Sequence, residues 1–175
     1  MKLRVKTIYS ILFILLFIPH ILLASGDIKR IETLKKDRNA WASMSKVLNR
    51  YSRDLSEIGI KLIDSEDKQL QYAAECVIDI SNAVGLLEIV YTLNANCSQT
   101  CLTIRDLYKQ NLRALSNASN VTDFYKSKIH ELYNKTQDTD ALRLIGESIE
   151  SIKELQKTLD DERKNLFSKL RETKK

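Results

Sequence analysis

Apolar residues recur every seven positions in the first third of the chain, and this repeat constrains the fold more than any other feature. Further apolar residues fall three positions after the middle members, which is the spacing of the a and d positions of a heptad. The seam consists of Leu34, Trp41, Leu48, Leu55 and Leu62, with Met44, Tyr51 and Ile58 between them. A seam of this kind predicts a helix that winds against other helices and buries one face.

Two later stretches have the same spacing and extend the helical prediction. The first consists of Leu70, Ala73, Val77, Ile80, Val84 and Leu87, and the second of Leu142, Ile145, Ile149, Ile152, Leu159, Leu166 and Leu170. Gln156 and Arg163 occupy core-type positions in the second stretch. Polar residues at such positions often fix the register of a bundle or face its looser end, at some cost in stability.

Signals for β structure are missing from the sequence after residue 26. That part of the chain has no proline, and its three glycines (Gly59, Gly85 and Gly146) lie inside apolar repeats. It has no Asn-Gly or Asp-Gly dipeptide and no alternating run of β-branched residues, which are the usual signals of hairpins and strands. The predicted fold class is therefore all-α.

Polar stretches divide the chain into helical segments of similar length. The predicted segments are residues 28–63, 66–94, 98–136 and 139–172. Asp64 or Ser65 is expected to cap the second segment, and Asp138 or Thr139 to cap the fourth. Because short links favour antiparallel neighbours, we predict an antiparallel bundle of four long helices. The alternative treats residues 66–116 as one helix, which would give an elongated coiled-coil hairpin with a small helical head.

The first 26 residues have the layout of a secretory signal peptide. A basic head without acidic residues precedes an apolar stretch from Ile8 to Ala24, and Gly26 completes a small-x-small cleavage motif. Cleavage would leave residues 27–175 as one helical-bundle domain, secreted or periplasmic. The alternative is an uncleaved segment that anchors the protein in a membrane, because a run of this length is at the short limit for a span.

Removal of the signal peptide changes the charge balance of the protein. The whole chain has 28 basic and 23 acidic residues, and the three charges of the signal are all basic, so 25 basic and 23 acidic residues remain. A balanced surface offers no electrostatic footprint for nucleic acid, which requires a basic face. We therefore expect a protein partner or a homo-oligomer, no nucleic acid, and no stable membrane anchor after cleavage.

The sequence contains no constellation of residues that predicts catalysis. His130 is the only histidine after residue 26, which excludes sites with paired imidazoles. Glycine-rich phosphate loops and serine-nucleophile motifs are missing from the sequence after residue 26. Glu75, Asp79 and Glu88 can line a polar interior, but the Glu-x-x-His motif of carboxylate metal bundles is missing. We expect no enzyme activity, no cofactor and no metal.

Cys97 and Cys101 stand four residues apart at the expected corner between the second and third segments. Asn96 and Gln99 can form a capping box there, which would place both cysteines in the first helical turns. Their α-carbons would then be about 6 Å apart, within disulfide range. We predict a disulfide that stabilises the corner by about 2 kcal/mol. The alternatives are reduced, inert cysteines, or a dimer crosslinked through Cys76.

Three Asn-x-Ser/Thr sequences cluster near an expected kink at residues 116–120 and near the last corner. Their asparagines are Asn117, Asn120 and Asn134. In a eukaryotic protein they would be glycosylation sites along an exposed edge. In a bacterial protein they would be polar caps and turns, with Ser119 or Asn120 as the cap at the kink.

These observations together indicate the class of function and leave the partner open. We expect an exported, non-enzymatic helical bundle that acts through protein–protein contacts, in envelope assembly, as a chaperone-like protein or in adhesion. The alternative is a helical carrier that binds a small ligand or a metal in the core of the bundle.

Overall fold

The structure, a computed structural model, describes the backbone of residues 2–97 and 103–173 and the side chains of residues 32–97 and 103–173. Within these residues the fold consists of four α-helices without strands. They are α1 (Lys2–Ile63), α2 (Lys68–Asn96), α3 (Ile104–Lys135) and α4 (Thr139–Glu172). The chain divides into two compact units, residues 1–39 and residues 40–175.

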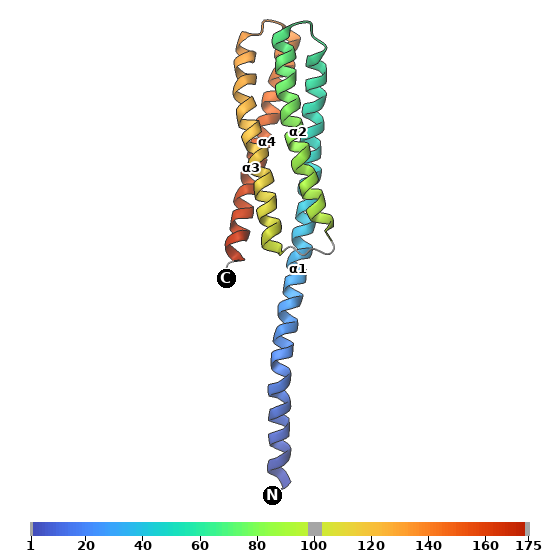
Figure 1. The fold of residues 1–175 in the computed structure, drawn as a ribbon, viewed down its shortest axis with the longest axis vertical. Coiled ribbons are helices and arrows are strands. Elements are labelled where there is room, and N and C mark those ends of the chain that lie inside the picture. The colour runs from blue at the N-terminus through green and yellow to red at the C-terminus, as the bar shows by residue number, and fades with distance from the viewer. Residues whose placement is uncertain (1, 98–102, 174–175) are drawn as a thin grey trace. The chain divides into compact units, whose positions relative to one another are not determined.

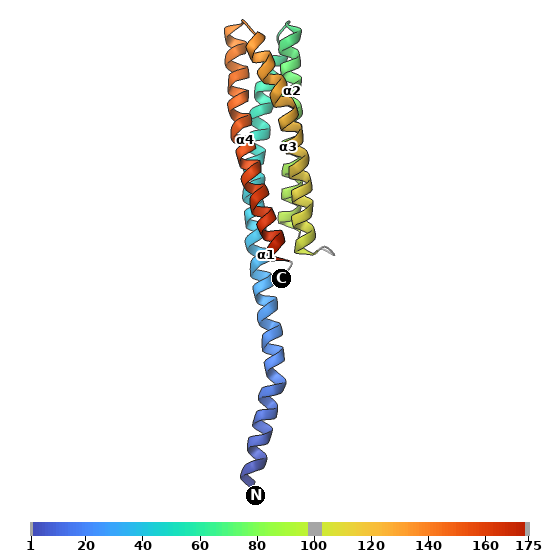
Figure 2. The ribbon, with the colours of Figure 1, turned by 90° about the vertical axis from the view of Figure 1, so that its left-hand side faces the viewer.

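Residues 40–175 form an antiparallel bundle of four helices (Figure 1), which confirms the predicted fold class. Ser45 of α1 bonds to Glu88 of α2, whereas Ser52 bonds to Ser81, so residue numbers rise along one helix as they fall along the other. Figure 2 shows the same bundle after a quarter turn, with every helix running against the one before it in the chain. Links of a few residues impose this direction, as the sequence predicts.

Two side-chain contacts show the register between α2 and α3. Asn94 donates to Asn111 near one end of the pair, and Tyr125 bonds to Asp79 toward the other. An α2 residue and an α3 residue therefore lie at the same height along the bundle when their residue numbers add up to about 205.

The predicted heptad seams supply the core of the bundle. The buried members are Trp41, Leu48, Tyr51, Leu55, Ile58, Leu62, Leu70, Ala73, Val77, Ile80, Val84, Leu87, Ile145, Ile149, Ile152, Leu159 and Leu166. Gln156 and Arg163 are not core residues, because both are half-exposed. Gln156 accepts a bond of 2.6 Å from Lys126 of α3, and Arg163 pairs with Asp160 at 3.3 Å.

The observed helix ends agree with most of the predicted breaks. Asp138 caps α4, as predicted, and its carboxylate accepts a bond of 2.7 Å from a backbone amide of the first turn. The predicted cap of α2 is wrong, because Asp67 takes that position instead of Asp64 or Ser65. The hydroxyl of Ser65 instead accepts a bond from the amide of Asp67, which completes the turn. The first helix begins at Lys2 and not near residue 28, since the apolar stretch of the predicted signal peptide is also helical.

The corner between α2 and α3 differs from the prediction. Thr103 caps α3 and forms a capping box with Asp106, in which each side chain accepts a backbone bond of 3.2 Å from the other residue. The predicted capping box at Asn96 is wrong, because Asn96 is the last residue of α2, and Gln99 lies outside the described residues. A single helix over residues 66–116 is also wrong, since α2 ends before this corner and α3 begins after it.

Helix α3 is one continuous helix through residues 116–120, where a kink with a cap at Ser119 or Asn120 was expected. Both Ser119 and Asn120 lie in its interior and cap nothing. Thr122 keeps the helical backbone and donates its hydroxyl to the carbonyl of Ala118 at 2.7 Å. Polar residues of this kind can bond within a helix as well as end it, which explains the wrong prediction.

Candidate functional site

A stretch of low charge stands out in the chain after the predicted signal peptide. Of all residues, 29% are charged, yet the 25 residues from Ile80 to Ile104 contain only Glu88, where about seven charges would be expected. Helix α2 occupies most of this stretch. Among the helices whose side chains are described, α2 alone is long and apolar enough, by length and composition, to cross a membrane. Packing against the other helices accounts for the apolar residues on only one face of α2.

Glu88, the single charged residue of this stretch, is hydrogen-bonded to α1. Ser45 donates its hydroxyl to Oε1 of Glu88 at 2.9 Å, and Thr92 donates to the same oxygen at 2.6 Å. Hydrogen bonds to a carboxylate are stronger than neutral ones, so this group ties α1 to one side of α2. Because Glu88 is half-buried there, the outer face of α2 carries no charge from Ile80 to Asn96.

Small residues let α1 approach α2 closely on that same side. Ser52 and Ser81 donate their hydroxyls to each other's backbone carbonyls, at 3.0 and 2.7 Å. A methyl group added at Gly59 would come within 2.6 Å of Ile78, and one added at Gly85 would come within 3.2 Å of Ser52. The close contact with α1 therefore fixes which face of α2 remains exposed.

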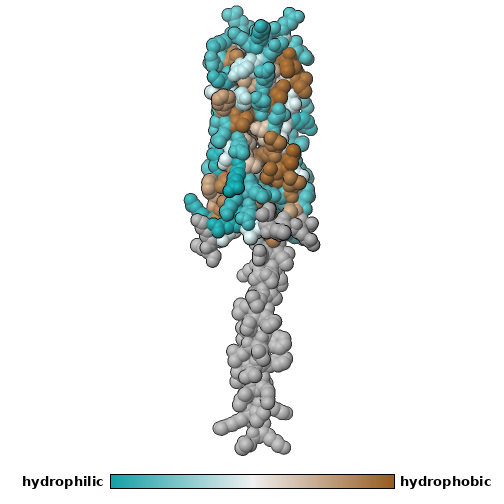
Figure 3. Space-filling model, viewed as in Figure 1, coloured by the Kyte–Doolittle hydropathy of each residue, from teal (hydrophilic) through white to brown (hydrophobic). Residues whose placement is uncertain are grey.

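Three large aliphatic side chains lie on the exposed face of α2. Leu86, Ile89 and Leu93 are 67%, 50% and 65% exposed. Spacings of three and four residues place them on one side of the helix, and we call this row the α2 stripe. The space-filling view shows apolar residues gathered over α2 on this face (Figure 3). Covering such a row removes apolar surface from water, at about 25 cal/mol for each Å², so the row indicates a contact surface.

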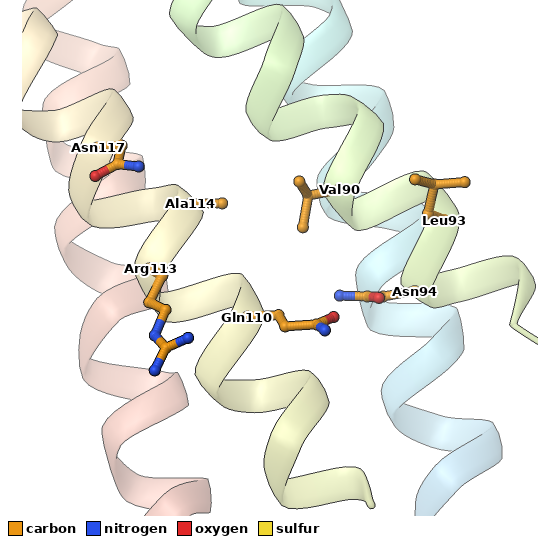
Figure 4. A pocket seen from close by; sticks show the side chains of 7 residues that line it. All are labelled: Val90, Leu93, Asn94, Gln110, Arg113, Ala114 and Asn117. Carbon is orange, nitrogen blue, oxygen red and sulfur yellow. The ribbon is translucent and has the colours of Figure 1, made fainter. Parts of the chain in front are cut away.

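An open groove between α2 and α3 adjoins the α2 stripe. Its volume is about 360 Å³, and it is lined by Val90, Leu93, Asn94, Gln110, Arg113, Ala114 and Asn117. In Figure 4, Val90 and Ala114 face each other across the groove, and the amides of Asn94 and Gln110 lie toward one end. Arg113 is exposed and extends from α3. The groove therefore combines apolar walls with a polar rim and one cation.

A buried amide pair lies at this groove. Asn94 donates a bond of 2.7 Å to Oδ1 of Asn111, and the two residues are 6% and 0% exposed. Nδ2 of Asn111 is buried without a hydrogen-bond partner among the residues that the structure describes. An unpaired buried donor costs about 1–3 kcal/mol, so the pair contributes more to the register of the helices than to their stability.

Helix α3 adds one exposed aromatic ring to the same side of the bundle. Phe124 is 59% exposed and stands seven residues, about two turns, after the groove residue Asn117. It therefore lies on the groove side of α3, near the height of α2 residue 81. Its ring meets that of Tyr125 edge to face, with centroids 5.0 Å apart. The exposed apolar residues of this face thus include Leu93 at one end and Phe124 at the other.

Charges of opposite sign flank this apolar surface. Glu75 and Asp79 are exposed toward the start of α2. At the other end of the surface, Lys109 and Arg113 of α3 are exposed. Asp106 lies 3.6 Å from Lys109 and offsets part of the positive charge. The surface therefore has an acidic end and a basic end, and Leu86 and Ile89 of the α2 stripe lie between them.

Ionisable groups near α2 keep their protons at neutral pH. Burial, followed by the nearby carboxylate of Glu162, raises the pKa of Tyr91 well above its usual range, and Tyr91 donates to that carboxylate at 2.9 Å. A hydrogen bond to Asp79 is the largest cause that raises the pKa of Tyr125 to about 12. Burial likewise raises the pKa of the Cys76 thiol. These groups are therefore protonated and are poor nucleophiles.

The acidic residues that the sequence suggested for a polar interior do not converge. Glu75 and Asp79 face solvent, and Glu88 is bonded to α1. His130 is half-exposed on α3. Among the residues whose side chains are described, no three His, Cys, Asp or Glu residues are grouped closely enough to hold a metal ion.

The geometry assumed for the predicted disulfide is not found at Cys97. This residue is the C-cap of α2 and has an extended backbone, whereas the prediction placed it in the first turn of the next helix. Cys101 lies outside the described residues, so the Cys97–Cys101 disulfide stays a prediction. Cys76 is wholly buried in the bundle.

The three asparagines predicted as glycosylation sites are all exposed, but none lies in a loop. Asn117, Asn120 and Asn134 all belong to α3, and the hydroxyl residues Ser119 and Thr122 of the first two sequences are buried. The expectation that these residues form caps and turns is therefore wrong. A modifying enzyme would reach the first two sequences only before α3 folds, because it must bind the whole sequence.

Comparison with known proteins adds nothing to this surface, since no family model, curated protein or solved structure matches the chain. The surface was also not predicted from the sequence. A signal was present, because Leu86, Ile89 and Leu93 lie off the heptad seam and no charge stands beside them except Glu88. A count of charges along the chain would have found the stretch between Asp79 and Arg105.

Proposed function

We propose that this chain is an exported, non-enzymatic helical bundle that acts by binding a protein through the α2 stripe and the adjoining groove. The observation that supports this most is the exposure of three large aliphatic side chains on a helix face without charge. A partner that covers such a face gains apolar burial and desolvates few polar groups.

The extent of the exposed surface favours a macromolecular partner over a small ligand. A small molecule in the groove would cover Leu93 and Val90, but Leu86 and Ile89 would stay in water. Small-ligand sites bury most of the ligand in a concave pocket with converging polar groups, whereas this groove is open. The second candidate function is a carrier of a small amphipathic ligand, and the apolar walls of the groove support it.

Export is part of this proposal and rests on the N-terminal sequence. The basic head, the apolar stretch from Ile8 to Ala24 and the small residues that follow support cleavage after Gly26. N-terminal sequencing of the purified protein tests this directly. A first residue of Asp27 agrees with a secreted or periplasmic protein, and an intact N-terminus requires the membrane-anchored alternative.

Photo-crosslinking in expressing cells tests whether the face binds a protein. A benzophenone amino acid at Ile89 is expected to give discrete protein adducts. The same amino acid at Glu154, an exposed position on α4, serves as the control and is expected to give none. A lack of adducts at Ile89 would overturn the proposed function.

Native mass spectrometry of the purified protein distinguishes the carrier. A carrier retains a small bound species, and the variant Ala114→Trp, which fills the groove, releases it. Binding of a protein through the α2 stripe predicts no such species.

A further inference from the structure

We infer that the partner of this face is a second copy of the same chain, placed antiparallel to the first by a two-fold axis that crosses α2 near Leu86. This inference rests on the proposed function and names the partner. Two-fold dimers are the commonest oligomers, and they require a surface that complements itself after the ends are exchanged.

The apolar part of the surface is arranged for such an exchange. Leu93 lies at one end, and Phe124 lies at the other, near the height of α2 residue 81. The midpoint of these heights is near residue 87. A two-fold axis there brings Phe124 of each copy to the height of Leu93 of the other, and it places Leu86 and Ile89 on both sides of the axis.

The flanking charges complement each other about the same axis. By the α2–α3 register, Arg113 and Lys109 lie near the heights of α2 residues 92 and 96. Rotation about residue 87 brings them near the heights of residues 82 and 78, within one turn of Asp79. The acidic end of each copy therefore meets the basic end of the other, and opposite charges across an interface favour that orientation.

Other partners fit this layout less well. A parallel second copy would bring acidic ends together and basic ends together, which is unfavourable. An anionic membrane surface attracts clusters of Lys and Arg but would repel Glu75 and Asp79 on this same face. Lys128 is half-buried near the acidic end and offsets one of these charges, but it does not reverse the sign.

The oligomeric state of the purified exported protein tests the inference. Light scattering during size-exclusion chromatography is expected to show a dimer that dissociates on dilution. The variant Leu86→Glu places two carboxylates beside the axis and is expected to raise the dimer dissociation constant about 100-fold. The matched control is Phe167→Glu on α4, because this side chain is 47% exposed and lies outside the proposed interface. The dimer dissociation constant of this variant should not change. Circular dichroism verifies that both variants fold.

Charge reversal at the two ends tests the antiparallel geometry itself. Reversing the acidic end with Glu75→Lys and Asp79→Lys, or the basic end with Lys109→Glu and Arg113→Glu, should each raise the dissociation constant about 10-fold. Reversing both ends in one chain should restore it. A combined variant that dimerises no better than the separate ones would overturn the two-fold arrangement.

Different results would overturn the proposed dimer and the proposed function. A protein that remains monomeric at every concentration overturns the second copy as partner. If Ile89 then crosslinks to a protein of another mass, the proposed function stands without the dimer. If neither a dimer nor an adduct forms, both are wrong.

Discussion

Asn94 of α2 and Asn111 of α3 join side-chain amides through one hydrogen bond of 2.7 Å, in a layer where the two residues are 6% and 0% exposed. A second register contact, between Asp79 and Tyr125, lies four turns away along α2 and near the surface. A polar pair inside an apolar seam disfavours shifted registers, because a shift would leave both amides without partners. This pair therefore positions the α2 stripe and the basic end of α3 relative to each other.

The first prediction concerns the energy of this pair. Asn111→Leu alone leaves the amide of Asn94 without its acceptor and should lower the free energy of unfolding by about 1–3 kcal/mol. Asn94→Leu should have an effect of similar size. The double variant removes both polar groups and should cost less than the sum of the single changes. Urea denaturation of the four proteins measures the coupling, and additive losses would contradict the contact.

The second prediction compares two glycines inside helices. Gly146→Ala should raise the free energy of unfolding by about 0.5–1 kcal/mol, since alanine favours a helix and the added methyl meets Tyr133 at an ordinary 3.7 Å. Gly59→Ala should lower it, because the methyl would come within 2.6 Å of Ile78 and force α1 away from α2. Thermal unfolding of both variants checks the opposite signs. Equal gains in stability would show that α1 and α2 are not in close contact.

The heptad seams could be predicted from sequence because leucines such as Leu48 and Leu55 stand in strict register and bury without polar neighbours. The inner face of α3 could not be predicted in the same way. It buries Asn111, Ser119 and Thr122, whose side chains resemble caps and turns when only the sequence is known. Their burial depends on tertiary partners, which no local pattern contains.

The surface of α2 was harder to recognise than its core. Leu86, Ile89 and Leu93 add apolar residues to a helix that already has a seam, and periodicity alone does not show which of two apolar faces packs inward. The choice is made by Gly59 and Ser52 of α1 and by Gly85 and Ser81 of α2, because only small residues permit that close approach of the two helices. Glu88 likewise lies on the inward-packing side of α2 only because Ser45 and Thr92 donate hydrogen bonds to its carboxylate.

The third prediction concerns the pH dependence of stability. Bonding to Asp79 raises the pKa of Tyr125 from 10.0 to about 12 in the folded protein. The unfolded chain releases this proton at lower pH than the folded chain, so the stabilisation is complete below pH 10 and is lost as the pH rises through about 12. The difference in unfolding free energy between the natural chain and Tyr125→Phe should therefore shrink over that range. A difference that is constant with pH would contradict the bond.

The control for this measurement is Asp79→Asn, which removes the charge of the acceptor and keeps its shape. In that variant the pKa of Tyr125 should move back toward 10.0, and most of the change with pH should disappear. Ultraviolet titration of the tyrosines gives an independent measurement of the same pKa. Lysines also lose their protons at high pH, but they do so in all three proteins and cancel in the comparison.

The fourth prediction concerns the three cysteines of the exported protein. In the folded state the thiol of Cys76 should react slowly with an alkylating reagent, because it is wholly buried and burial raises its pKa. After denaturation without reductant, one thiol should react if Cys97 and Cys101 are joined. Mass spectrometry counts the added groups, and a count of three would exclude the disulfide. The variant Cys76→Ala shows which cysteine carries the free thiol. If Cys97 and Cys101 are joined, this variant should have no reactive thiol until a reductant is added. A thiol that still reacts would belong to the corner and not to the core.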